Sequence, residues 1–101
     1  MKEYNKLVRD KIPEIIKKKG GKYKIHIADK KEYWRKLKEK LLEEIKEFSK
    51  SETIEEFTAI MEVLDAVRDY KKFDKKRLEA IKKKKVRERG GFKKKIILEE
   101  S

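Results

Sequence analysis

Carboxylates in two parts of the chain are spaced so that each group can share one face of a helix. The first group is Glu43, Glu44 and Glu47, and the second is Glu62 with Asp65. A helix turns about 100° per residue, so side chains three apart project together. Mg²⁺ prefers such oxygen ligands and commonly binds them together with substrate phosphates, so the spacing predicts a Mg²⁺ site, with Mn²⁺ as an alternative ion, and phosphate-ester hydrolysis. The competing interpretation is a solvated surface, because 51% of the residues are charged.

The composition limits the kinds of site that this chain can build. It has no cysteine, so it has neither a disulfide nor a thiolate metal site, and the single His26 cannot form a histidine cluster. Any metal must therefore be bound by oxygen. No apolar run approaches the roughly 18 residues that span a bilayer, and no signal peptide is recognisable at the N-terminus, so we expect a cytoplasmic protein without a membrane partner.

The net charge is strongly positive, with 32 Lys and Arg against 20 Asp and Glu, which gives +12. A field of this sign attracts polyanions, meaning nucleic acid, anionic lipid or nucleotide phosphates. The second explanation is composition alone. Many Lys and Glu residues, no Cys and one Pro are typical of proteins from thermophiles, in which charged surface networks replace thermolabile residues.

Hydrophobic periodicity and capping residues predict a mainly α fold, with a single domain over residues 1–101. We expect a bundle of about four helices built around an antiparallel helical hairpin that turns near residue 51. The expected helix starts are Asp10 for a short helix ended by Gly20, the Asp29/Glu32 and Thr53/Glu56 capping boxes for the hairpin, and Asp74 for a last helix to about Arg87.

Two short segments outside these helices have strand-like patterns: apolar and polar residues alternate in the first, and the second contains the apolar run Ile96-Ile97-Leu98. The segments, near residues 23–27 and 95–98, predict two strands that pair with each other as a small β element. The predicted helix over residues 52–70 is apolar on most of its circumference, whereas 101 residues enclose little core. We therefore also expect a homodimer or a higher homo-oligomer.

Four stretches of the chain together resemble a known family. They are the segment from Tyr4 to Ile16, Glu43-Glu44-x-x-Glu47, Glu55-Glu56 followed by Glu62, and Arg87-Glu88-Arg89-Gly90-Gly91-Phe92. They are similar to the all-α nucleoside triphosphate pyrophosphohydrolases, in the MazG-like, phosphoribosyl-ATP pyrophosphohydrolase-like branch. The resemblance implies cleavage of a nucleotide between its α- and β-phosphates, with Mg²⁺ held by carboxylates on helices.

The resemblance also assigns roles to individual residues. Glu44 and Glu47 match metal ligands, but the Asp that usually follows Glu56 by three residues is Ala59 here. Either Glu56 or the pair Glu62 and Asp65 therefore completes the metal site. A free carboxylate, Glu43 or Glu47, is the candidate for orienting the attacking water. The substrate-binding candidates are Lys6, Arg9, Lys11 and Arg89 for phosphates, and Asn5 for a base edge or a turn.

A function of another class is also consistent with the sequence. The basic last helix and the Arg-Gly-Gly-Phe stretch at residues 89–92 could bind phosphates without chemistry, as in a non-catalytic nucleic-acid- or nucleotide-binding protein. Charge is the only support for this alternative, because the sequence contains no helix-turn-helix or zinc-module signature.

Overall fold

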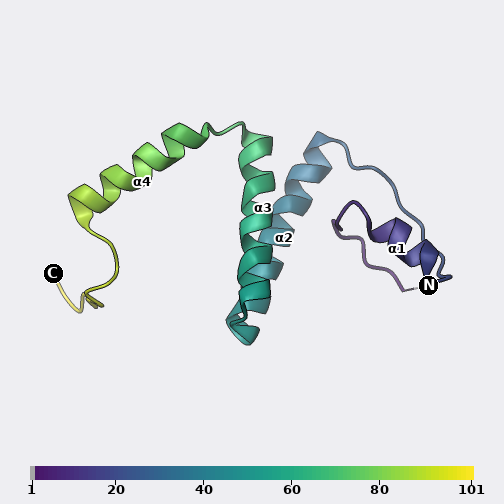
Figure 1. The fold of residues 1–101 in the computed structure, drawn as a ribbon, viewed down its shortest axis with the longest axis horizontal. Helices are drawn as coiled ribbons and strands as arrows, with labels where there is room; N and C mark the ends of the chain where they lie inside the picture. The colour runs from purple at the N-terminus through teal and green to yellow at the C-terminus, as the bar shows by residue number, and fades with distance from the viewer. Residues whose placement is uncertain (1) are drawn as a thin grey trace. The chain divides into compact units, whose positions relative to one another are not determined.

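The computed structural model describes residues 2–101, which are mainly helical (Figure 1). This part of the chain contains α1 (Ile12–Lys18), α2 (Lys30–Ser51), α3 (Ile54–Lys71) and α4 (Lys75–Arg89). The helices belong to two compact units, of which the first ends at Tyr70 and the second runs from Lys71 to Ser101. The mainly α prediction is therefore confirmed, and each unit is described by itself.

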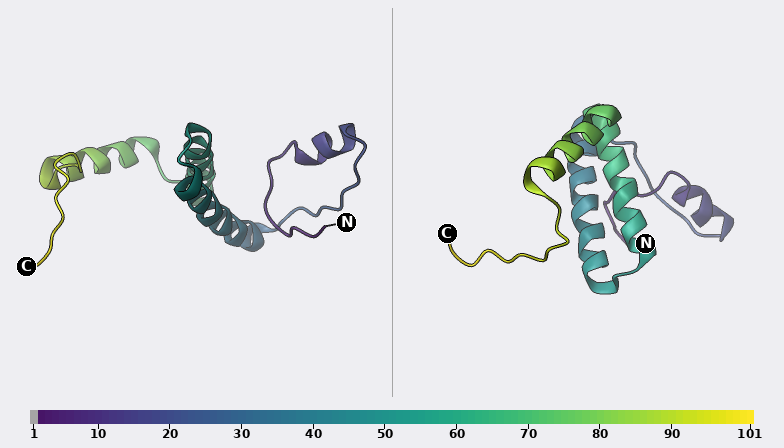
Figure 2. Two further views of the ribbon diagram at one scale, coloured as in Figure 1. Left: turned by 90° about the horizontal axis from the view of Figure 1, so that it is seen from below. Right: turned by 60° about the vertical axis from the view of Figure 1, so that its left-hand side comes forward.

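Helices α2 and α3 form the antiparallel hairpin that the sequence predicts, and they lie side by side in Figure 1 and in the right-hand view of Figure 2. The Asp29 carboxylate caps α2 by accepting a hydrogen bond from the Glu32 backbone N–H at 2.8 Å. The turn between the helices consists of Glu52 and Thr53. Glu52 ends α2 in a left-handed conformation with φ 52°, and Thr53 directly precedes α3. The Thr53 hydroxyl accepts from the Glu56 N–H at 3.3 Å, as expected for a capping residue.

Aromatic pairs join the two helices at both ends of the hairpin. Near the turn, Phe48 meets Phe57 edge to face with ring centroids 5.8 Å apart. At the open end, the Trp34 and Tyr70 rings stack at 4.9 Å. Between them Leu37 is 2% exposed, and it is the one fully buried hydrophobic residue in the described part of the chain. The hairpin therefore has little core of its own.

Helix α1 begins at Ile12 with Pro13 in its first turn, where the missing N–H has no helical acceptor to lose. The prediction that Asp10 caps this helix is wrong, because Lys11 is at the N-cap and no side chain bonds to the first turn. Gly20 ends the helical segment with φ +79°, a conformation that favours glycine.

The predicted two-stranded β element is absent from the described residues. Residues 23–27 and 95–98 have no strand structure, and their apolar side chains are exposed, to 88% for Ile27 and 83% for Ile97. The two segments belong to different units. Alternation of apolar and polar residues is a local signal, whereas a strand needs a hydrogen-bonding partner and a surface to cover, and an isolated two-stranded pair is marginal in water.

The second unit consists of α4 and an irregular tail. The Asp74 carboxylate caps α4 as predicted, accepting from the Arg77 N–H at 2.9 Å. The helix continues to Arg89, two residues beyond the predicted end, and Gly90 follows with φ +80°. Among residues 2–101, no helix is both long and apolar enough to cross a membrane.

Candidate functional site

An irregular segment, residues 5–9, makes polar contacts with both helices of the hairpin. On α2, the Lys36 ammonium donates to the Asn5 carbonyl oxygen, and the Lys6 ammonium lies 3.1 Å from a Glu43 carboxylate oxygen. On α3, the Arg9 guanidinium binds Glu62. The structure thus places Asn5, Lys6 and Arg9, all chosen from the N-terminal motif, against the two helices that carry the acidic motifs.

The contact between Arg9 and Glu62 is bidentate. The two terminal guanidinium nitrogens donate to the two carboxylate oxygens at 2.6 and 3.0 Å. Hydrogen bonding to Arg9, together with its positive charge, lowers the pKa of Glu62, and the same contact raises the pKa of Arg9. Both side chains are largely exposed to solvent. The guanidinium fork fits a phosphate group as well as a carboxylate, so an incoming phosphate can compete with Glu62 for Arg9.

Nearer the turn, the Glu44 and Glu56 carboxyls face each other across the hairpin. The pKa of Glu56 is raised, first because its protonated form hydrogen-bonds to Glu44, then by burial and by the negative charges of Glu44 and Glu47. Glu44 is only 14% exposed. The Oε2 atom of Glu56 is buried and has no hydrogen-bond partner among residues 2–101. Glu56 therefore has an unsatisfied acceptor beside a second carboxyl group, which a cation or a hydrogen-bond donor could satisfy.

A lysine that the sequence interpretation missed lies beside this acidic pair. The Lys40 ammonium is 3.3 Å from a Glu44 oxygen and 3.8 Å from a Glu43 oxygen, and it partly offsets the rise in the pKa of Glu56. The sequence contains a signal for this contact, because Lys40 lies four residues before Glu44 and therefore shares a helix face with it. Lys40 is the basic partner that makes a largely buried Glu44 carboxylate tolerable without a metal.

The remaining predicted residues are Asp65, Lys11 and Arg89, and none of them belongs to the contacts described above. Asp65 forms an ion pair with Arg68 of its own helix at 3.1 Å and is exposed. Lys11 is an exposed residue at the start of α1. Arg89 is the last residue of α4, in the second unit. The structure thus joins Glu44, Glu47 and Glu56 electrostatically, and it joins Glu62 to Arg9 rather than to Asp65.

The arrangement of the carboxylates limits how these residues could bind Mg²⁺. Within residues 2–101 there is no group of three or more His, Cys, Asp or Glu side chains arranged to hold a metal, so a cage made only of protein ligands does not fit. Mg²⁺, however, is commonly held by one or two carboxylates plus substrate phosphates. The like-charged Glu44 and Glu56 pair, with its orphaned buried oxygen, fits that second kind of site.

Two neighbouring clusters therefore define the site: an acidic pair across the hairpin, and a basic N-terminal segment bound to the same two helices. The first cluster can attract a cation, and the second can exchange carboxylates for phosphates. Comparison with known proteins adds no family assignment to this geometry, since neither a family model, nor a curated protein, nor a solved structure matches the chain.

Proposed function

We propose that this protein is a Mg²⁺-dependent nucleotide pyrophosphohydrolase, which cleaves a nucleoside triphosphate or a related nucleotide to a monophosphate and pyrophosphate. The observation that carries the proposal is the attachment of the Lys6 and Arg9 segment to the helices that hold the Glu44 and Glu56 pair. It brings phosphate-binding cations and metal-binding carboxylates to one hairpin. The sequence resemblance described above supports the same reaction.

In this proposal, Glu44 and Glu56 hold the metal, with Glu47 adding negative charge beside them. The chemistry supplied by a bound Mg²⁺ is neutralisation of the substrate phosphates and activation of the attacking water. In its protonated form Glu56 hydrogen-bonds to Glu44, and its raised pKa means that it releases the proton at a higher pH than an ordinary glutamate does. Metal binding requires that proton to leave, so we expect activity to rise with pH through the raised pKa of Glu56.

The basic segment has a separate role, which is to bind and orient the phosphates. Arg9 can exchange the Glu62 carboxylate for a substrate phosphate, because both groups accept the same pair of N–H bonds. Lys6 can exchange Glu43 in the same way. The exchange frees Glu43 to hold and orient a water, and it frees Glu62 beside the substrate. We place this activity in the cytoplasm, in a homodimer or higher homo-oligomer.

The test is to identify the first product formed from a panel of canonical and damaged nucleoside triphosphates, with Mg²⁺, with Mn²⁺ and with EDTA. We expect metal-dependent release of pyrophosphate from at least one nucleotide, and loss of about 100-fold or more in the Glu44→Gln variant. Glu55→Gln is the matched control, since Glu55 is an exposed carboxylate in the first turn of α3. Orthophosphate as the first product, or equal turnover in Glu44→Gln, would refute the proposal.

A further inference from the structure

The positive charge of this protein is concentrated in the second unit. Residues 71–101 contain 14 Lys and Arg against five Asp and Glu, a net charge of +9, whereas residues 1–70 contain 18 against 15, a net charge of +3. Thus most of the total of +12 lies in less than a third of the chain. A composition shift for high temperature raises Lys and Glu together, so it does not account for this separation.

Few of the basic side chains in α4 have an acidic partner. The helix has nine Lys and Arg and two Glu. Its ion pairs are Lys82 with Glu79 at 3.6 Å and Lys84 with Glu88 at 3.9 Å. Within residues 2–101, the side chains of α4 without an ion pair are Lys75, Lys76, Arg77, Lys83, Lys85, Arg87 and Arg89. The basic segment of the first unit, by contrast, is matched to Glu43 and Glu62.

The charges surround α4 instead of leaving an apolar face. At 100° per residue, Lys82, Lys85 and Arg89 fall within the same arc as the apolar positions Leu78, Ile81 and Val86. A helix that lies on a membrane needs a continuous apolar face, so this distribution does not suit a lipid surface. The apolar run of residues 96–98 does not change that conclusion, since Glu99 and Glu100 follow it directly and are repelled by anionic lipid.

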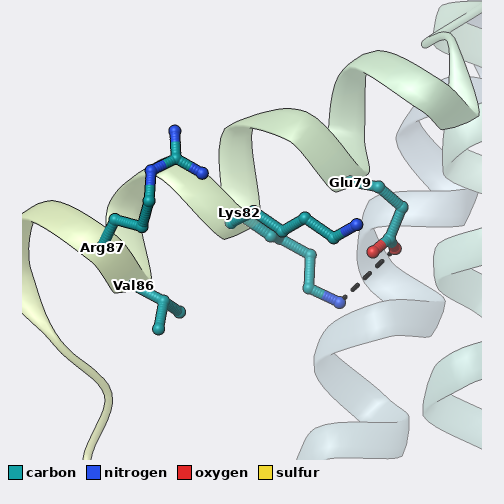
Figure 3. Close-up of a pocket in the computed structure, with 5 residues that line it drawn as sticks. Glu79, Lys82, Val86 and Arg87 are labelled. Atoms are coloured by element: carbon teal, nitrogen blue, oxygen red, sulfur yellow. Dashed lines mark ion pairs between the residues drawn. The ribbon is translucent and has the colours of Figure 1, made fainter.

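One side of α4 carries a shallow, open hollow lined by Lys82, Lys83, Arg87, Glu79 and Val86 (Figure 3). Glu79 pairs with Lys82 at one end, and Arg87 lies at the other end (Figure 3). Such an open surface cannot enclose a small molecule, but it can accept phosphates spaced along a polymer. Beyond the helix, Phe92 is 97% exposed and directly precedes Lys93, so it offers an aromatic ring for stacking on a base.

We infer that residues 71–101 form a binding surface for the phosphate backbone of a nucleic acid, independent of base sequence. This surface does not rest on the proposed hydrolysis, which involves only the first unit. Because phosphate contacts do not sense the 2′-hydroxyl, we expect RNA and DNA of equal length to bind with similar affinity.

The test is fluorescence anisotropy of the full chain with labelled RNA, single-stranded DNA and duplex DNA of about 20 nucleotides, over a range of salt concentrations. We expect the logarithm of the affinity to fall linearly with the logarithm of the salt concentration. In a variant with Lys82, Lys83, Lys84 and Lys85 all changed to Gln, the affinity should fall tenfold or more, and the slope should decrease by about 2 to 4.

The matched control changes Lys17, Lys19, Lys22 and Lys24 to Gln, which removes the same charge from exposed positions of the first unit. We expect this control to keep its affinity within about threefold, and circular dichroism should show unchanged helix content in both variants. An equal loss in the control would overturn the inference, because only net charge would then matter. Binding to vesicles of phosphatidylserine and phosphatidylcholine without binding to any oligonucleotide would overturn it as well.

Discussion

At the scale of single residues, the raised pKa of Glu56 makes stability depend on pH in a definite direction. A carboxyl whose pKa is higher in the folded state binds its proton more tightly there than in the unfolded chain. Its contribution to stability is therefore complete below the ordinary pKa of glutamate, and it is lost as the pH rises through the raised value. Above that raised value, the ionised Glu56 carboxylate beside Glu44 destabilises the folded state.

We therefore predict that Glu56→Gln raises the melting temperature by a few degrees at neutral pH in EDTA, because the amide donates to Glu44 without a charge. At about pH 4 the difference from the unaltered protein should disappear. Addition of Mg²⁺ should raise the melting temperature of the unaltered protein more than that of the variant. Thermal unfolding followed by circular dichroism measures all three effects, and a variant less stable at neutral pH would contradict the assignment.

At the scale of elements, the N-terminal segment should act mainly on substrate binding. The Arg9→Lys substitution keeps the positive charge but removes the bidentate hydrogen bonding that a guanidinium group can make. If Arg9 exchanges Glu62 for a phosphate, KM should rise about tenfold, whereas kcat should change less. Lys11→Gln is the comparison, because Lys11 is exposed and its side chain has no hydrogen bond or ion pair to α2 or α3 within residues 2–101. Steady-state kinetics with the nucleotide found to be cleaved would measure both variants, and equal effects would contradict the role of Arg9.

The face of α3 that carries Glu56 allows a sharper test of the metal site. Ala59 is three residues from both Glu56 and Glu62, so an Asp at this position adds a carboxylate to the same face. We expect Ala59→Asp to increase Mg²⁺-dependent turnover about tenfold, since a site with few carboxylates gains a ligand. Asp65→Asn should change turnover little, because Asp65 pairs with Arg68 instead. If Asp65→Asn reduced turnover strongly and Ala59→Asp changed it little, the metal ligands on α3 would instead be Glu62 and Asp65.

The sequence predicted those elements whose signals are local. The Asp29 and Asp74 caps are confirmed, and the hairpin forms because its apolar stripes repeat along two long helices. The prediction of strands at residues 23–27 and 95–98 was wrong, since neither alternation nor a short apolar run shows whether a partner strand is available. In the site, helical spacing could have identified the Lys40 contact, but no spacing rule links Arg9 to Glu62 across 53 positions. Such non-local pairs depend on the path of the chain.

At the scale of the whole molecule, the exposed apolar surface of the hairpin makes self-association the next expectation. The side chains of Ile54, Phe57, Met61 and Leu64 on α3 are about half exposed or more, and Ile54 reaches 76%. Within residues 2–101 a single hydrophobic side chain is fully buried. An apolar helix face of this extent is typical of a protein interface, and covering it would supply the core that the hairpin lacks.

We predict that light scattering at micromolar concentration gives a mass at least twice the 12.2 kDa of one chain. Met61→Glu should reduce the mass to that of the monomer, because it places a charge in the buried centre of the expected interface. The matched control is Val86→Glu, which adds the same charge at an exposed apolar position of α4 and should leave the mass unchanged. Since the expected interface belongs to the first unit, the lysine-to-glutamine variant of α4 should also keep its assembly. A monomeric mass for the unaltered protein, or equal dissociation by both glutamate variants, would show that this apolar face is not where copies meet.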